Sequence, residues 1–262
     1  MKLQLVSART GANWVRLGVR TFFKQPLALA GLFFMFMALM SVVSMAPLLG
    51  LPLAMLLLPA CTLGLMAAAR EAASGKFPMP LILLTAFRSG QATLRAMLTL
   101  GALYAAGFMV VMGLSYLADG GAFARMYLGG QAPTAAMLES GEFLSAMWVF
   151  IGLHLPLSLL FWHAPALVFW HHLTPGKSLF FSLVACFRNF WAFAVFAATW
   201  MMLMVLGVLA VTALARMLGS PETAGVLLMP ALLLVASMFF TSLYFTYLDC
   251  FSQSVDDVPA GH

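Results

Sequence analysis

The sequence predicts an all-α membrane protein, a polytopic bundle of six transmembrane helices in three hairpins, with short amphipathic interfacial helices on the cytoplasmic side. Of 262 residues, 63% are hydrophobic and only 8% are charged, whereas a soluble domain averages about 25% charged residues. So few charges could not cover the surface of a soluble fold of this length. The apolar runs are also long, and a helix needs about 20 apolar residues to cross a bilayer.

Six apolar runs are long enough to cross, and they define a transmembrane domain over residues 26–248. The uncharged stretch MAPLLGLP joins the first two and predicts a hairpin that barely leaves the membrane. An amphipathic cytoplasmic helix is expected over 1–25 and a cytoplasmic tail over 249–262. Basic residues persist to Lys24 without a convincing cleavage site after them, so we expect no cleavable signal peptide. The predicted spans are 26–45, 48–69, 92–117, 143–170, 190–215 and 224–248.

The distribution of lysine and arginine predicts the orientation, because cytoplasmic loops carry an excess of these residues. With a cytoplasmic N-terminus, eleven of the 13 basic residues lie inside and two, Arg125 and Arg216, lie outside. We therefore expect both termini in the cytoplasm of a bacterial cell, with the chain in the inner membrane. The eleven are Lys2, Arg9, Arg16, Arg20, Lys24, Arg70, Lys76, Arg88, Arg95, Lys177 and Arg188.

The first helix has a basic face and an apolar face. At 100° per residue, Arg9, Arg16, Arg20 and Lys24 fall within an arc of about 80°, and Trp14, Val15 and Phe22 lie broadly opposite. The pattern predicts a helix lying on the inner leaflet with its apolar face in lipid. A helix packed on the cytoplasmic loops is the alternative.

Two shorter interfacial helices are expected at 80–88 and 177–187. We expect four basic residues of the three interfacial helices to anchor to anionic lipid headgroups. The four interfacial anchors are Arg16, Arg20, Lys24 and Arg88.

Three segments that precede outward spans resemble one another. They read TFFKQPLALAG from Thr21, TAFRSGQATLR from Thr85 and ACFRNFWAFAV from Ala185. In each, an aromatic residue precedes a basic one, which places a ring and a cation at headgroup level. Each returning span contains proline. Together these features indicate a weak threefold repeat of helical hairpins.

Three stretches resemble an uncharacterised family of polytopic inner-membrane proteins from beta-proteobacteria: NWVRLGVRTFFKQPLALAG, LLLPACTLGLMAAAREAASGK and HAPALVFWHHLTPGKSLFFSLVACFRNFW. Residues 162–193 are also distantly similar to the membrane domain of bacterial glycerophosphodiester phosphodiesterases. There too an Ala-Pro step leads to a short amphipathic helix that ends near Arg-Asn, here Arg188 and Asn189. The resemblance implies six helices and an inner-membrane location, but no activity, since the phosphodiesterase domain is missing here.

The histidines in FWHAPALVFWHH do not form a chelating pair on a helix. His163 and His171 are about 12 Å apart along the axis, and the adjacent His171 and His172 diverge by about 100°, whereas ligands of one ion lie within about 4 Å of each other. A haem with one axial ligand, His163 or His154, remains the alternative. We expect no metal or cofactor, and free thiols at the three cysteines.

The polar residues of the spans favour binding over catalysis. No span contains an internal Asp, Glu or Lys, which argues against an ion-driven pump and against carboxylate chemistry. We therefore expect a non-enzymatic protein that binds anionic lipid, or a membrane-protein partner or second copy, and not nucleic acid. A transporter or exporter of an apolar or amphipathic molecule, with a wet cavity at mid-membrane, is the alternative.

A candidate polar cluster is expected at the cytoplasmic edge. An intramembrane lipid-modifying enzyme would need four of its members, all but His163, to converge on one pocket. For Asn189, capping of the fifth span is one role. We favour another, in which Arg188 and Asn189 tie the last hairpin to the fourth span near Pro165 and His171. The cluster comprises His163, His171, His172, Arg188 and Asn189.

Overall fold

The computed structural model describes residues 2–217 and 221–252 and confirms the all-α fold class. Six of its helices are long and apolar enough to cross a membrane. A short antiparallel pairing joins Lys2 to Ser252 and Leu3 to Phe251. In chain order the elements are β1 (Lys2–Leu3), α1 (Arg9–Lys24), α2 (Pro26–Ser44), α3 (Gly50–Ala73), η1 (Pro80–Arg88), α4 (Gln91–Asp119), α5 (Ala122–Gly129), α6 (Ala135–Glu139), α7 (Gly141–Phe161), α8 (Ala164–His171), α9 (Pro175–Arg188), α10 (Phe190–Met217), α11 (Pro221–Cys250) and β2 (Phe251–Ser252).

The long helices begin and end within four residues of the predicted spans, with one difference. The fourth span is not continuous, because α7 ends at Phe161 and α8 begins at Ala164. Of the predicted C-terminal tail, residues 253–262 lie outside the described residues, as do residues 218–220 of the last predicted loop.

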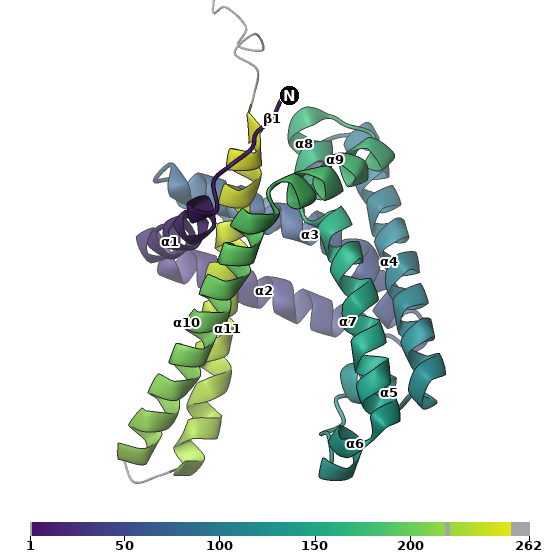
Figure 1. The fold of residues 1–262 in the computed structure, drawn as a ribbon. Helices are drawn as coiled ribbons and strands as arrows, with labels where there is room; N and C mark the ends of the chain where they lie inside the picture. Colours follow the sequence, from purple (N-terminus) through teal and green to yellow (C-terminus); the bar gives the residue numbers. More distant parts are fainter. Residues whose placement is uncertain (1, 218–220, 253–262) are drawn as a thin grey trace, which may run out of the picture. The chain divides into compact units, whose positions relative to one another are not determined.

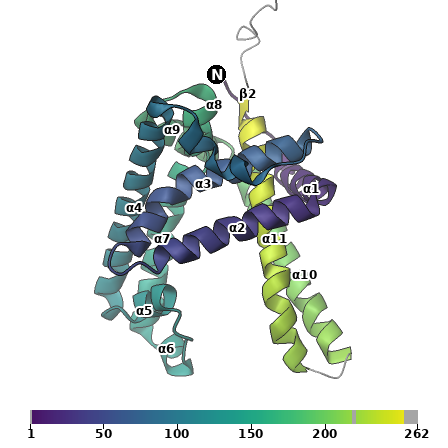
Figure 2. The ribbon, with the colours of Figure 1, turned by 180° about the vertical axis from the view of Figure 1, so that it is seen from behind.

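The chain divides into two compact units, each described here by itself. Unit 1 comprises Met1–Met40, Ala60–Gly90 and Val184–His262, and unit 2 comprises Ser41–Pro59 and Gln91–Leu183. In unit 1, α10 and α11 run side by side and α1 lies against both (Figure 1). In unit 2, α4 and α7 run side by side, with α5 and α6 at the far end of α7 (Figure 2).

The apolar face of α1 packs on protein, so the expectation that it lies in lipid is wrong. Trp14, Val15 and Phe22 are each at most 3% exposed. Trp14 lies against two rings of α10, with centroids 5.1 Å from Phe193 and 6.0 Å from Phe196. The alternative of packing on the cytoplasmic loops also differs from the structure, because the partners are the long helices themselves.

Two glycines allow this close packing. A Cβ added at Gly11 would collide with the Ala192 carbonyl oxygen of α10, and one added at Gly18 would lie 2.8 Å from the Cα of Ser242 in α11. Seven residues separate the two glycines, so they lie on one face of the helix, as expected from a turn of 3.6 residues. The backbone of α1 therefore lies almost directly on the backbones of α10 and α11.

Two backbone features mark the break between α7 and α8. Pro165 has no N–H to donate to the carbonyl of Phe161, but Pro156 lies inside α7 without ending that helix, so proline alone does not explain the break. Two residues earlier, the bond expected from the N–H of His163 to the carbonyl of Leu159 is replaced by a bridge through α9. The His163 N–H donates to Ser182 Oγ (3.0 Å), and Ser182 Oγ donates to the Leu159 oxygen (2.8 Å).

Each of the three interfacial helices contacts helices outside its own hairpin. The helix α1 precedes the α2–α3 pair but packs on α10 and α11. Likewise η1 precedes the α4–α7 hairpin but lies on α3, where Leu83 contacts the backbone at Gly64. The helix α9 precedes the α10–α11 hairpin but is bonded through Ser182 to α7. The helix α1 thus packs extensively on the last hairpin, whereas η1 and α9 are linked to the preceding pair of helices by the contacts named above.

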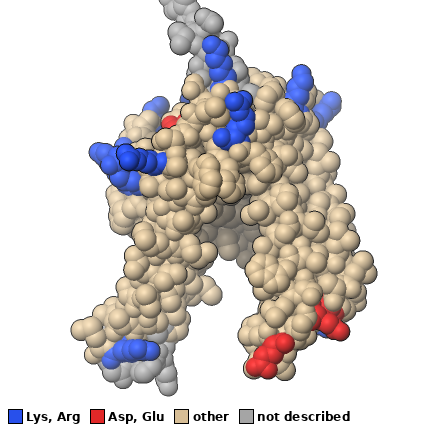
Figure 3. Space-filling model, viewed as in Figure 1, with Lys and Arg blue, Asp and Glu red and all other residues tan. Residues whose placement is uncertain are grey.

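The sides of the long helices carry no charged surface on the face shown in Figure 3. The blue and red atoms gather instead over α1 and at the ends of the long helices. This agrees with the high cost of placing a charge in the hydrocarbon core.

The close contact at Gly18 predicts a strong effect of substitution. Gly18→Leu should lower the thermal stability of the purified protein by the equivalent of about 3 kcal/mol or more, because the side chain would meet backbone that cannot yield. The control is Ala12→Leu, which adds a larger side chain to the same helix at an exposed position and should change stability little. Equal losses from both variants would contradict packing of α1 on α11.

The bridge through Ser182 predicts a second effect. Ser182→Ala should cost about 1–3 kcal/mol, because it removes both hydrogen bonds of the buried bridge between His163 and Leu159. Ser178→Ala is the matched control, since Ser178 is equally buried in α9 but its hydroxyl donates to the carbonyl of Pro175 in the same helix. Thermal unfolding of both variants in one detergent makes the comparison. A loss from Ser178→Ala as large as that from Ser182→Ala would show that the bridge is not important.

Candidate functional site

The five residues of the predicted polar cluster divide between the two units. His163, His171 and His172 belong to unit 2, and Arg188 and Asn189 belong to unit 1. Each group has its own surroundings.

His163 is a fully buried residue at the break between α7 and α8. Its backbone N–H forms half of the bridge through Ser182 described above. Pro165, the second residue of α8, lacks the backbone N–H that would bond to Phe161, the last residue of α7. His163 is thus a structural residue of the interrupted span.

His171 and His172 end α8. His172 has a left-handed backbone conformation with φ 52°, and its N–H and that of Leu173 both donate to the carbonyl of Leu167. This arrangement closes a helix in the way that glycine usually does. His172 is exposed, and its position in the fold is explained by the turn from α8 to α9.

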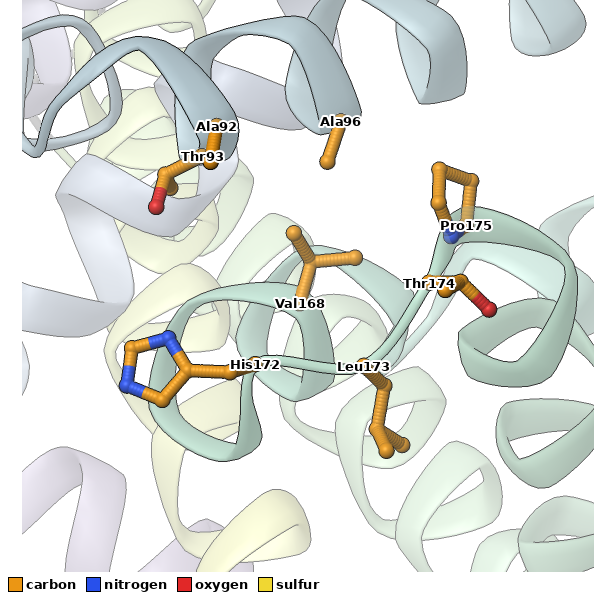
Figure 4. A pocket seen from close by; sticks show the side chains of 8 residues that line it. All are labelled: Ala92, Thr93, Ala96, Val168, His172, Leu173, Thr174 and Pro175. Carbon is orange, nitrogen blue, oxygen red and sulfur yellow. The ribbon is translucent and has the colours of Figure 1, made fainter.

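A small pocket in unit 2 lies between the start of α4 and this turn. In Figure 4 the side chain of Val168 points toward α4, and the ring of His172 lies at the same side as Thr93. The cavity measures about 210 Å³, below the 300–1,000 Å³ typical of small-molecule sites. Its lining comprises Ala92, Thr93, Ala96, Val168, His172, Leu173, Thr174 and Pro175.

His154, the other histidine considered for haem, lies in an aromatic cluster of unit 2. Its ring stacks on Phe150 at 5.0 Å with an interplanar angle of 10°, and it meets Phe108 edge-on at 6.0 Å. Tyr127 of α5 also packs on Phe150, at 4.9 Å. Within residues 2–217 and 221–252, no group of three or more His, Cys, Asp or Glu side chains is placed to hold a metal ion.

Asn189 is a tie in unit 1, but not to the partner that we expected. Its side chain is 2% exposed. The amide oxygen accepts from the N–H of Val6 (2.9 Å), and the amide nitrogen donates to the Gln4 carbonyl (3.0 Å) and lies 3.7 Å from Cys250 Sγ. Asn189 therefore fastens the N-terminal segment to the start of α10 and the end of α11, and not to the fourth span.

The predicted anchors differ in what they contact. The side chains of the anchors Arg16, Arg20 and Arg88, and that of Arg188 from the polar cluster, are exposed. None of the four forms a hydrogen bond or ion pair with another described residue. Lys24 is also exposed, but its ammonium donates to the carbonyl of Ala73 at the end of α3 (2.9 Å). A cation at that helix terminus is favoured by the helix dipole.

The three cysteines are buried free thiols, as predicted. Cys186, on α9, lies outside the spans. Burial, with a smaller contribution from the neighbouring Cys250, raises the pKa of the Cys186 thiol above its usual value. The thiolate is the reactive form, so burial of Cys186 disfavours reaction of this thiol.

Two contacts were missed by sequence reasoning. The indole N–H of Trp14 donates to the Asp249 carboxylate (2.8 Å), a pair separated by 235 positions. Ser182 was likewise not singled out. The sequence contained a signal for the Trp14–Asp249 bond, because Asp249 directly follows the last predicted span and Trp14 lies on the apolar face of α1. No local pattern marks Ser182.

The comparisons with known proteins agree with the fold. No family model and no solved structure matches the chain, and no link appears to the membrane domain of glycerophosphodiester phosphodiesterases. A probable inner membrane protein of Burkholderia thailandensis is 39% identical over 263 residues, covering 99% of this chain and 97% of that protein. With this identity over its whole length and six apolar helices long enough to span, the chain belongs to the family of that probable inner membrane protein.

Proposed function

We propose that this integral inner-membrane protein is not an enzyme and that it binds anionic phospholipid through the basic face of α1. The α1 basic face comprises Arg9, Arg16 and Arg20. We further propose that this face and both termini lie on the cytoplasmic side.

The observation that carries the proposal is the contrast between the two faces of α1. The apolar face is fully used by α10 and α11, since Trp14 and Val15 are buried there. The opposite face presents three exposed guanidinium groups that bond to no other described residue. Because the helix is held by protein on one side, its cations have a fixed position in which to meet phosphates.

The charge distribution supports the same ligand. Eleven of the 13 basic residues fall on one predicted side of the membrane, and by the positive-inside rule that side is the cytoplasmic one. The cytoplasmic leaflet carries anionic lipid, and a basic residue near that surface gains about 1 kcal/mol from it. Guanidinium groups also bind phosphate oxygens bidentately.

Transport, the alternative function, needs a polar-lined cavity near the middle of the membrane. The pocket described above lies instead at the start of α4 and the α8–α9 turn. It therefore does not favour transport.

Titration with phosphatidylglycerol tests the proposal. The purified full-length protein in neutral detergent should gain thermal stability as this lipid is added, and more than it gains from phosphatidylcholine. The double variant Arg16→Gln/Arg20→Gln should lower the apparent affinity by about 2 kcal/mol, or about 30-fold. The effect should also shrink toward 1 M salt, where the screening length falls to about 3 Å.

The control double variant is Arg125→Gln/Arg216→Gln, which removes two exposed arginines from the opposite predicted side. It should leave the phosphatidylglycerol response unchanged. An equal loss in the control, or equal stabilisation of the wild type by both lipids, would contradict the proposal. A second copy or another membrane protein would then be the better candidate for the α1 basic face.

A further inference from the structure

The junction between α9 and α10, in unit 1, carries an exposed patch that the α1 basic face does not include. The junction patch comprises Phe187, Arg188, Phe190 and Trp191, and all four side chains are exposed, Trp191 to 72%. Asn189, in the middle of this stretch, is buried. Three large aromatic side chains and one cationic side chain thus flank the buried Asn189 in the sequence.

The patch is held in place from behind. The Asn189 amide is bonded to Gln4 and Val6, and its backbone N–H donates to Ala185 in α9 while its carbonyl accepts from Ala192 and Phe193 in α10. The rings of Phe190 and Trp191 meet edge-on at 5.4 Å, a favourable geometry for aromatic pairs. The exposed side chains therefore stand on a backbone that cannot easily move.

The length of α10 is consistent with an interfacial position of the patch. Its 28 residues span about 42 Å at 1.5 Å per residue, which exceeds the hydrocarbon thickness of about 30 Å. The excess of about 12 Å allows the first turn, with Phe190 and Trp191, to lie in the interfacial layer, where aromatic side chains are enriched in membrane proteins.

The charge of the patch selects its occupant. The guanidinium group of Arg188 forms no hydrogen bond or ion pair with another described residue. An exposed guanidinium within three residues of three exposed aromatic rings matches a molecule that joins a phosphate diester to an apolar part. A phospholipid has both.

We propose that the junction patch binds one phospholipid molecule. Arg188 holds the phosphate through two parallel N–H···O bonds, and Phe187, Phe190 and Trp191 pack against the glycerol and the first carbons of an acyl chain. The inference rests on the proposed function only in that the ligand is a lipid. It requires a single molecule at a defined place, whereas the α1 basic face requires only surface charge.

Native mass spectrometry of the full-length protein tests the site. With phosphatidylglycerol added to gentle detergent, the wild type should retain one lipid molecule per chain. Arg188→Gln and Trp191→Ala should each lower the retained fraction about tenfold or more, because each removes one half of the recognition. Both positions are exposed, so thermal unfolding should show that both variants remain folded.

Two comparisons decide the outcome. The α1 variant Arg16→Gln/Arg20→Gln should keep the retained lipid, so that a failure of the α1 proposal can be distinguished from a failure of this one. Diacylglycerol, which lacks the phosphate, should not be retained. Equal retention of lipid by wild type and both patch variants, retention of diacylglycerol, or a protein chain in place of lipid would overturn the proposal.

Discussion

The contact between α1 and the α10–α11 hairpin is the interaction on which unit 1 depends. It is possible because Gly11 and Gly18 carry no side chain, so that the backbone of α1 closely approaches Ala192 of α10 and Ser242 of α11. Small residues serve this purpose in membranes, where packing contributes more than the hydrophobic effect between helices. The same contact decides the function that we propose, since it buries the apolar face of α1 and leaves its arginines outside.

The three interfacial helices differ in how they contact the long helices. The contacts are a glycine pair in α1, one glycine of α3 under η1, and a serine bridge from α9. Packing of α1 links the first helix to the last hairpin. The weak threefold repeat stays a prediction, because only α1 packs extensively on long helices.

The sequence predicted the six spans because their signal is compositional and does not depend on neighbours. The sequence could not predict what contacts the apolar face of α1, since Trp14 and Val15 suit lipid and a protein surface equally. The predicted partner of Asn189 was wrong for a similar reason. A buried amide requires hydrogen bonds, but the pattern does not state whether the N-terminal segment or the fourth span supplies them. For the break near His163, the sequence contained one signal, Pro165. The contribution of Ser182 could not be predicted, because no local pattern marks it.

Hydrogen exchange of the α1 amides tests most directly whether α1 belongs to the protein or to the lipid. The packing described here predicts slow exchange over Trp14–Phe22 in neutral detergent, with nearly the same protection after transfer to bilayers that contain anionic lipid. Protection should follow the stability of α10 and α11, because the three helices open together. Fast exchange in detergent that becomes slow only in anionic bilayers would contradict the packing and restore the lipid-facing helix.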